Sequence, residues 1–318
     1  MTSNSAQAGP SSRAGLPVAP PPDLGGRRRP VETLVKLVLV LSAGLSVAVT
    51  FGIIAAVIGP AVHFFQEVPL SDFFSTDDAD SSSGVRAAVV PLVLGTFLTT
   101  VIALALAIPL GLGAAMYLSE YASPRARAWL KPIVELLAGV PSVVYGFFAL
   151  YFVTPQLLQG LLNLDVNFTN AWAAGLVLGV MIIPTIASLS EDALSAVPQA
   201  LRQGSFAMGA NRMQTTVRVV LPAALSGVAA AVVLGLSRAV GETMIVTMAG
   251  GAVKNMSVDP SEPHMTMTAF IAITAQGENP VGSVDYNMLF AVGLLLFAMT
   301  FVINAISIAV VRRYRQVY

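Results

Sequence analysis

The chain has 318 residues, of which 55% are hydrophobic and only 11% charged, and its mean hydropathy is +0.76. Soluble domains carry about 25% charged residues, so this composition excludes an ordinary soluble protein and indicates one that crosses a lipid bilayer several times. The lack of cysteine excludes disulfides and thiolate metal sites, and the zero net charge argues against nucleic-acid binding.

The first 30 residues are rich in Pro, Gly, Ser and Ala without hydrophobic periodicity, which predicts a disordered cytoplasmic tail. Six apolar segments follow, each long enough to cross a bilayer, which takes ~20 residues. The first has no signal-peptide cleavage site, so we expect an uncleaved anchor. The pattern predicts one all-α transmembrane domain over 31–318, with spans at about 37–59, 88–118, 132–157, 170–190, 221–252 and 287–311.

Basic residues predict the orientation, because they concentrate in cytoplasmic loops. With the N-terminus inside, all of the 17 lysines and arginines except Arg86, Lys254 and Arg238 lie in the tails or inner loops. We therefore expect a multi-pass protein of the plasma membrane with both termini in the cytoplasm. Its outer loops are rich in Asp and Glu, so this face would repel a free anion.

Two full charges lie in the apolar stretch "LGLSRAVGETMIVTMAGG", residues 234–251. A charge near the bilayer centre costs about 2.5–3.5 kcal/mol on the insertion scale. Because Arg238 and Glu242 are four residues apart, a continuous helix would place them on one face. Two interpretations stay open: a structural ion pair, or a pathway in which Arg238 binds an oxyanion and Glu242 holds its guanidinium.

The third span contains "AGVPSVVYG", in which Gly139, Pro141 and Ser142 stand close together. These residues can kink a helix and turn backbone groups toward a pathway. The alternative is ordinary helix packing through small residues.

The inner loop 191–220 is too long for a simple hairpin. Pro198 can open a helix, Gly209 interrupts it, and a second short basic helix leads into Leu221 and Pro222. This pattern predicts a helix–turn–helix at the membrane surface, either as an amphipathic surface helix or as a site for a cytoplasmic partner.

The spacing of this loop resembles the coupling motif of ABC-importer permeases. That motif has an E-A-A triplet, a Gly after three further residues, and I-x-L-P nine residues later. The matching positions here are Gln203, Gly204, Ser205, Gly209, Val219, Leu221 and Pro222. The triplet reads Q-G-S in this chain, so Gln203 has the length of the family's Glu without its charge, whereas small residues at 204 and 205 would permit close packing.

Three further stretches resemble the phosphate-specific ABC-importer permeases: "AIPLGLGAAMYLSEYA" (107–122), "AGVPSVVYGFFAL" (138–150) and "SRAVGETMIV" (237–246). Thr243 favours phosphate over sulfate or molybdate, and "GETMIVTMAGG" is more similar to the PstC type of permease subunit than to the PstA type. The resemblance implies the type I ABC-importer permease fold. We take Arg238, Glu242, Thr243 and Ser142 as candidate residues of the substrate pathway.

No phosphate-binding loop of the form GxxxxGK[ST] occurs in the chain. We therefore expect no catalysis and no cofactor here, with ATP and Mg bound by a separate ATPase. The resemblance implies a PstB-type ATPase dimer, a second permease of the PstA type and an extracytoplasmic phosphate-binding protein of the PstS type. Two alternatives stay open: a sulfate- or molybdate-type ABC permease, and a proton-coupled anion carrier that uses Arg238 and Glu242 as a relay.

Overall fold

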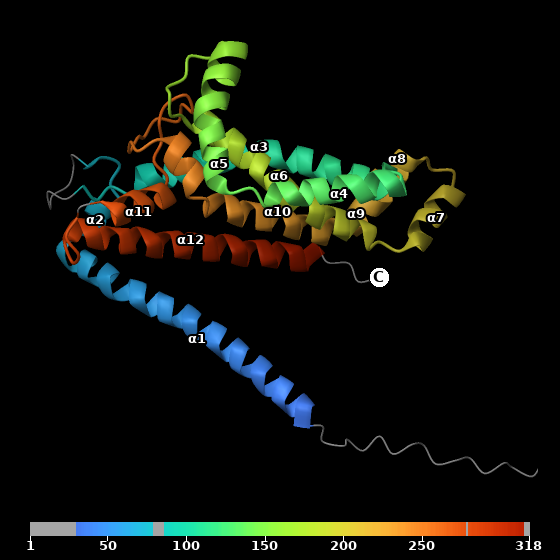
Figure 1. Cartoon of the computed structure of the whole chain (residues 1–318), viewed down its shortest axis with the longest axis horizontal. Helices are drawn as coiled ribbons and strands as arrows, with labels where there is room; N and C mark the ends of the chain where they lie inside the picture. Colours follow the sequence, from blue (N-terminus) through green and yellow to red (C-terminus); the bar gives the residue numbers. More distant parts are fainter. Residues whose placement is uncertain (1–29, 79–85, 278, 315–318) are drawn as a thin grey trace, which may run out of the picture. The chain divides into compact units, whose positions relative to one another are not determined.

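The computed structural model describes residues 30–78, 86–277 and 279–314 (Figure 1). Apart from Pro30, the predicted N-terminal tail lies outside these residues. The chain divides into two compact units, Met1–Gly52 and Ile53–Tyr318. Helix α1 (Pro30–Glu67) belongs to both units, and its side chains from 31 to 52 are apolar or small for the most part and exposed throughout. A helix that is apolar all round is typical of a membrane span.

The second unit is helical, and no strand occurs among the described residues. Several helices continue into π-helical stretches, labelled η. The remaining elements are α2 (Leu70–Phe73), α3 (Val90–Met116), η2 (Tyr117–Tyr121), α4 (Pro124–Ala138), α5 (Ser142–Phe148), η3 (Ala149–Leu161), α6 (Ala171–Ser195), α7 (Gln199–Ala207), α8 (Arg212–Thr215), η4 (Thr216–Val220), α9 (Leu221–Ala223), α10 (Leu225–Val240), η5 (Val246–Gly250), α11 (Met267–Gln276) and α12 (Val284–Tyr314).

Within the described residues, four helices are long and apolar enough to cross a membrane, and six spans result if each of two bent helix pairs counts as one. The first bent pair is α4 with the continuous helix α5–η3, at 86°. The second joins 212–223 to α10 at 73°. The expected third span is therefore broken at Pro141, where the sequence predicts a kink, and the expected fifth span is broken at Ala224, where it predicts none.

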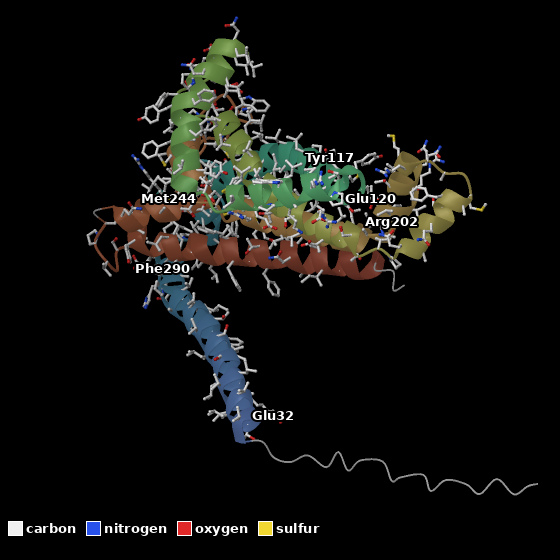
Figure 2. The ribbon with its side chains drawn as sticks, turned by 45° about the vertical axis from the view of Figure 1, so that its right-hand side comes forward. Glu32, Tyr117, Glu120, Arg202, Met244 and Phe290 are labelled. Atoms are coloured by element: carbon white, nitrogen blue, oxygen red, sulfur yellow. The ribbon has the colours of Figure 1, made fainter. Side chains whose placement is uncertain are left out.

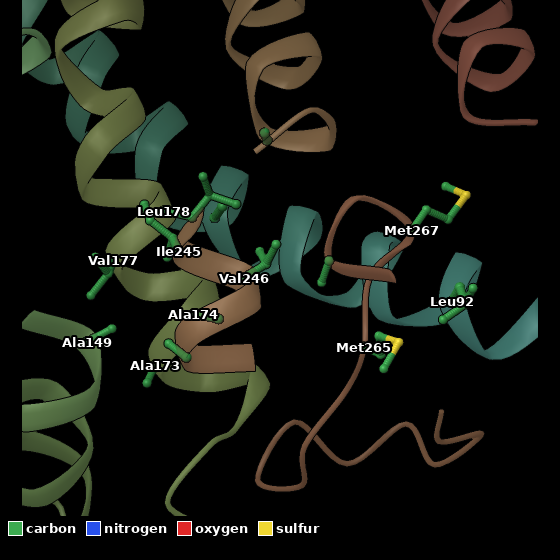
Figure 3. Close-up of a cluster of buried hydrophobic side chains, with 14 of the residues drawn as sticks. Leu92, Ala149, Ala173, Ala174, Val177, Leu178, Ile245, Val246, Met265 and Met267 are labelled. Atoms are coloured by element: carbon green, nitrogen blue, oxygen red, sulfur yellow. The ribbon is translucent and has the colours of Figure 1, made fainter. Parts of the chain in front are cut away.

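Helices α3 and α6 form the centre of the second unit. Their backbones approach closely at Gly175 and Gly179, where an added Cβ would lie 2.7 Å from the Ile102 side chain and 2.8 Å from the Ala103 carbonyl oxygen. This Gly-xxx-Gly spacing is the arrangement that lets membrane helices pack backbone to backbone. Figure 3 shows the neighbouring apolar core, in which side chains of α3, α6 and η5 meet residues of the segment before α11.

The two ends of this unit carry different elements (Figure 1). Helices α7 and α8 lie at one end, where the charge pattern predicts the cytoplasm. Helices α2 and α11 lie at the other end. Helix α5 and the following η3 leave the bundle crosswise and expose many aromatic side chains.

Candidate translocation and coupling sites

Arg238 and Glu242 are separated by a break in the helix. Helix α10 ends at Val240, Gly241 is its C-cap, and helical structure resumes at Met244. The expectation of one helical face for the two charges is therefore wrong, since Glu242 lies in the break. No salt bridge joins the two residues in the described part of the chain.

Arg238 is half-buried where three helices meet. Its Nη1 donates to Thr185 Oγ1 of α6 at 3.0 Å, and its charge acts on the Tyr145 ring hydroxyl of α5. A guanidinium has five N–H donors, and this hydrogen bond uses one of them. The remaining donors have no carboxylate partner among the described residues, so the guanidinium can bind an oxyanion by donating to its oxygens.

Glu242 caps the helical segment that follows the break. Its Oε1 accepts hydrogen bonds from the backbone N–H of Met244 at 3.0 Å and of Ile245 at 3.3 Å. A carboxylate is stabilised at a helix N-terminus both by these bonds and by the helix dipole. The backbone carbonyl oxygen of Glu242 accepts a hydrogen bond from Thr268 Oγ1 at 2.7 Å, which connects the break to α11. Glu242 therefore shapes the backbone of the break.

Thr243 and Ser142 lie near this break without a hydrogen bond to Arg238 among the described residues. Thr243 Oγ1 is 3.4 Å from the Gly241 carbonyl, and Ser142 opens α5 directly after the 86° bend. Helix α5 does reach the segment after the break, because an added Cβ on Gly146 would lie 2.7 Å from Met248 Sδ. Glu242 and Thr243 thus lie in the break, Arg238 lies in the last turn of α10 before it, and Ser142 begins the helix that packs against the segment after it.

The bend between α4 and α5 follows the kink expected from Gly139 and Pro141. Gly139 is the C-cap of α4 and Pro141 the N-cap of α5. The Tyr145 hydroxyl donates to the Leu137 carbonyl oxygen at 3.0 Å, which otherwise accepts, among the described residues, only a long hydrogen bond of 3.4 Å from the Val140 N–H, so Tyr145 stabilises the end of α4. Tyr145 thereby connects the bend to the surroundings of Arg238.

The coupling segment, residues 199–223, has the expected helix–turn–helix form. Gly209 has φ of +85°, a conformation that only Gly adopts without strain, and the Asn211 side chain caps α8. Ser205 Oγ lies 2.8 Å from Thr215 Oγ1 and joins α7 to α8. Leu221 and Pro222 form α9, directly before the 73° bend.

Gln203 and Gly204 are exposed, and an added Cβ on Gly204 would meet nothing within 4 Å. The expected packing role of a small residue at 204 is therefore wrong for contacts inside this chain. Large apolar side chains are exposed on the same segment: Met208 at 88%, Met213 at 67% and Phe206 at 47%. Such a patch is typical of a protein-binding surface.

Arg202 anchors the coupling segment to the rest of the unit, and the sequence pattern did not single it out. It pairs with Glu120 of η2 at 2.8 Å, and each side chain is only 8% exposed (Figure 2). The guanidinium also donates to the carbonyl oxygens of Leu194, at 2.8 Å, and Val197, both at the C-terminal end of α6. One side chain therefore joins α7, η2 and α6.

A second ionic cluster joins α4 to α6. Glu191 is 0% exposed and binds Arg127 as well as Lys131, whose Nζ lies 2.7 Å from Glu191 Oε2 and 2.7 Å from Asp192 Oδ1. The predicted span ended at 190, whereas α6 continues to Ser195, so Glu191 lies inside a helix. The four-residue spacing of Arg127 and Lys131 was the available signal, since it places both on one helical face.

At the opposite end, Lys254 joins two segments that are distant in sequence. Its Nζ donates to Asp78 Oδ1 at 2.9 Å and to the Arg86 carbonyl oxygen at 2.8 Å. Burial lowers the pKa of Lys254, against the opposing effect of Asp78. The two basic residues assigned to the outer face thus lie together beside a carboxylate.

Comparison with known proteins identifies relatives along most of the chain. Residues 107–316 match the family described as "Binding-protein-dependent transport system inner membrane component". The probable ABC transporter permease protein YqgH of Bacillus subtilis is 37% identical over 73% of this chain and 74% of its own. The phosphate transport system permease protein PstC 1 of Mycobacterium tuberculosis is 34% identical over 75% and 76%, and PstC of Mesorhizobium japonicum 33% identical over 68% and 70%.

Solved structures with the same fold include two importers. The MetNI methionine ABC transporter in an inward-facing conformation matches 72% of this chain and 94% of its own with a TM-score of 0.53 and 23% identity. A bacterial alginate ABC transporter in complex with an alginate-bound periplasmic protein matches 89% and 98% with a TM-score of 0.62 and 17% identity. At these identities the likeness establishes the fold.

Proposed function

The chain belongs to the family of binding-protein-dependent transport system inner membrane components, and from this we propose that it is a PstC-type permease subunit that moves inorganic phosphate into the cytoplasm. Membership makes it a multi-pass ABC-importer permease of the type I fold, and a non-catalytic one. The alternative of a proton-coupled carrier is thereby excluded. The identity of the anion, the route and the coupling to ATP are the parts that we propose.

The observation that carries the proposal is Arg238, a cation within an apolar helix with a single hydrogen bond in use. A half-buried guanidinium with free donors in an apolar helix is favourable where an anion completes its coordination. Its planar fork fits two phosphate oxygens. Thr185 would orient the group, while Glu242, Thr243 and Ser142 would shape the backbone around the anion. Relatives named as phosphate permeases support this choice over sulfate or molybdate.

The coupling segment is the proposed contact for a separate ATPase dimer of the PstB type, which would bind the ATP and Mg. Its exposed apolar residues, together with Gln203 and Gly204, would contact the ATPase surface. Ser205, Gly209, Leu221 and Pro222 would keep the segment in its helix–turn–helix form. The buried Arg202–Glu120 pair would transmit the movement of α7 to α6 and η2. A PstA-type permease would complete the pathway across the membrane.

In this assignment both termini and the coupling segment face the cytoplasm, and the acidic outer loops face a PstS-type binding protein. Because the outer loops repel free phosphate, capture would depend on that protein. Arg86 and Lys254 would be too close to Asp78 to reverse the charge of this face.

The test is phosphate uptake into proteoliposomes that contain the whole complex, with ATP inside the vesicles on the ATPase side. We expect Arg238→Gln to abolish uptake and Thr185→Val to reduce it several-fold with unchanged assembly, because the valine leaves the guanidinium unoriented. Leu234→Ala, an exposed position on the same helix, is the matched control. Uptake by Arg238→Gln at the wild-type rate would refute the pathway, and stronger competition by sulfate or molybdate than by phosphate would refute the substrate.

A further inference from the structure

A polar cavity of about 240 Å³ lies at the base of the coupling segment. Five elements contribute to its wall: η2, α4, α7, α8 and the C-terminal turn of α6. A water molecule occupies about 30 Å³, so the cavity has room for a tetrahedral oxyanion with part of its hydration shell. Figure 2 shows Glu120 and Arg202 together at this end of the unit.

The charge of the cavity wall is positive. Arg127, Arg202 and Arg212 line it together with one carboxylate, that of Glu120. Glu120 is bound by Arg202 through three contacts of 2.8–3.4 Å, so it is neutralised inside the wall. Of the remaining two guanidiniums, that of Arg127 on α4 is paired with Glu191, whereas that of Arg212 on α8 has no acidic partner among the described residues and leaves the wall its positive charge.

These two guanidiniums retain free donors. Arg127 uses Nη2 for both Glu191 and Ser195, so its Nε and Nη1 make no hydrogen bond among the described residues. Arg212 lies 5.9 Å from the centre of the Tyr121 ring and has no acidic partner in the described part of the chain. The hydroxyl groups of Ser119 and Ser195 also line the wall.

We infer that this cavity is a binding site for a phosphate group, held between Arg212 and Arg127 and distinct from the pathway at Arg238. Two arginines with open donors on separate elements are the arrangement that binds phosphate oxygens with most specificity. The group can belong to free cytoplasmic phosphate or to the headgroup of an anionic lipid. Both sources present the same oxyanion to the same donors.

Occupancy would tie α8 of the coupling segment to α4. If the proposed function holds, the anion would then restrain the segment that contacts the ATPase and would slow ATP turnover when phosphate accumulates inside. This consequence rests on the proposed function, whereas binding itself does not, so the two are measured separately.

The first arm measures equilibrium binding of radiolabelled inorganic phosphate to the purified complex with both permeases and the ATPase. It uses nanodiscs of neutral phosphatidylcholine without binding protein or nucleotide. All variants carry Arg238→Gln, which removes the proposed pathway site. We expect Arg212→Gln to weaken the remaining binding at least tenfold. Arg218→Gln, which removes an exposed cation of the same segment outside the cavity wall, should change it less than twofold.

A second variant guards against a failure of Arg212→Gln to assemble. Gln199 lines the cavity at the first position of α7, where a glutamate is favourable to the helix dipole. Gln199→Glu should therefore fold and assemble while its charge repels the anion, and we expect the same tenfold loss. Subunit ratios on gels report the assembly of every variant.

The second arm uses nanodiscs with a tenth of the lipid replaced by phosphatidylglycerol. A lipid source predicts that this lipid co-purifies with the complex, that it blocks inorganic phosphate, and that Arg212→Gln releases it. A free-phosphate source predicts binding that the lipid leaves unchanged. The inference is overturned if neither ligand responds to Arg212→Gln or Gln199→Glu, as would be found if an acidic side chain of the ATPase fills the cavity.

Discussion

Loss of the Arg202–Glu120 pair should detach the coupling segment from the rest of the protein. Arg202→Met keeps most of the side-chain volume but leaves the Glu120 carboxylate, 8% exposed, without its cation. Breaking a buried ion pair from one side costs about 3–5 kcal/mol. The Val197 carbonyl group also loses its Arg202 donor, at about 1–3 kcal/mol for a group that becomes buried and unpaired, whereas the Leu194 carbonyl keeps the Val197 N–H at 3.3 Å.

Glu120→Gln should cost less, about 1.5–3 kcal/mol, because the amide oxygen still accepts from Arg202 and the two carbonyls keep their donor. In the double variant that combines Arg202→Met with Glu120→Gln no charge is left buried, so we expect it to be more stable than the sum of the two single effects predicts. The double-mutant cycle should then give a coupling energy of about 2–3 kcal/mol.

The assay is denaturant unfolding of the complex in mild detergent, followed through helix content, together with ATP hydrolysis stimulated by the binding protein. We expect Arg202→Met to lower stimulated hydrolysis more than basal hydrolysis, since α7 loses its link to α6. An unchanged unfolding midpoint for Arg202→Met, or a coupling energy below about 0.5 kcal/mol, would refute the assignment of this pair as the anchor.

Three further predictions concern other parts of the second unit. Glu191→Gln should lower the free energy of unfolding by about 3 kcal/mol, because it removes the buried partner of Arg127 and Lys131. Asp192→Asn should change it by less than about 1 kcal/mol, because that side chain is 59% exposed. Denaturant titration measures both. Gly209→Ala should lower the free energy of unfolding by about 1–2 kcal/mol because Gly209 has a positive φ. The control Gly204→Ala in α7 should be neutral or stabilising by up to about 1 kcal/mol. If thermal unfolding shows Gly204→Ala to be the less stable of the two, the positive-φ turn at Gly209 is contradicted. Because burial lowers the pKa of Lys254, the unfolded chain holds this proton to a higher pH than the folded chain does. The free energy of unfolding should therefore rise with pH between the lowered pKa and the ordinary value of 10.5. Lys254→Met should reduce that rise when unfolding is measured at alkaline pH.

The sequence was sufficient for features that depend on local chemistry. Pro141 and Gly139 predicted the bend between α4 and α5, and Pro198 and Gly209 predicted the two helices of the coupling segment. The break after Val240 was missed, because apolar residues flank it on both sides and the spacing of Arg238 and Glu242 was interpreted on a continuous helix. Apolar composition reports burial in lipid and does not report where the backbone ladder is interrupted.

The ionic contacts were outside the reach of sequence patterns for a different reason. Glu120 and Arg202 are 82 positions apart, and Lys131 and Glu191 are 60 apart, so only the packing of α6 against its neighbours brings them together. A count of positive charges assigns Lys131 and Arg202 each to an inner loop, but it cannot pair either one with a carboxylate. Thr185 was missed likewise, since a single threonine in an apolar helix has no local signal.

The close backbone contact of α3 and α6 at Gly175 and Gly179 has a mechanical consequence. Two helices in contact through their backbones cannot slide without a clash, so we expect α3 and α6 to move together as one rigid unit. If the proposed transport function holds, the movement that opens the pathway falls on the helix interruptions at 139–141, Ala224 and 241–243. Glu242 and Thr243 lie in the last of these interruptions and Ser142 directly follows the first, so a movement there would also change the surroundings of Arg238.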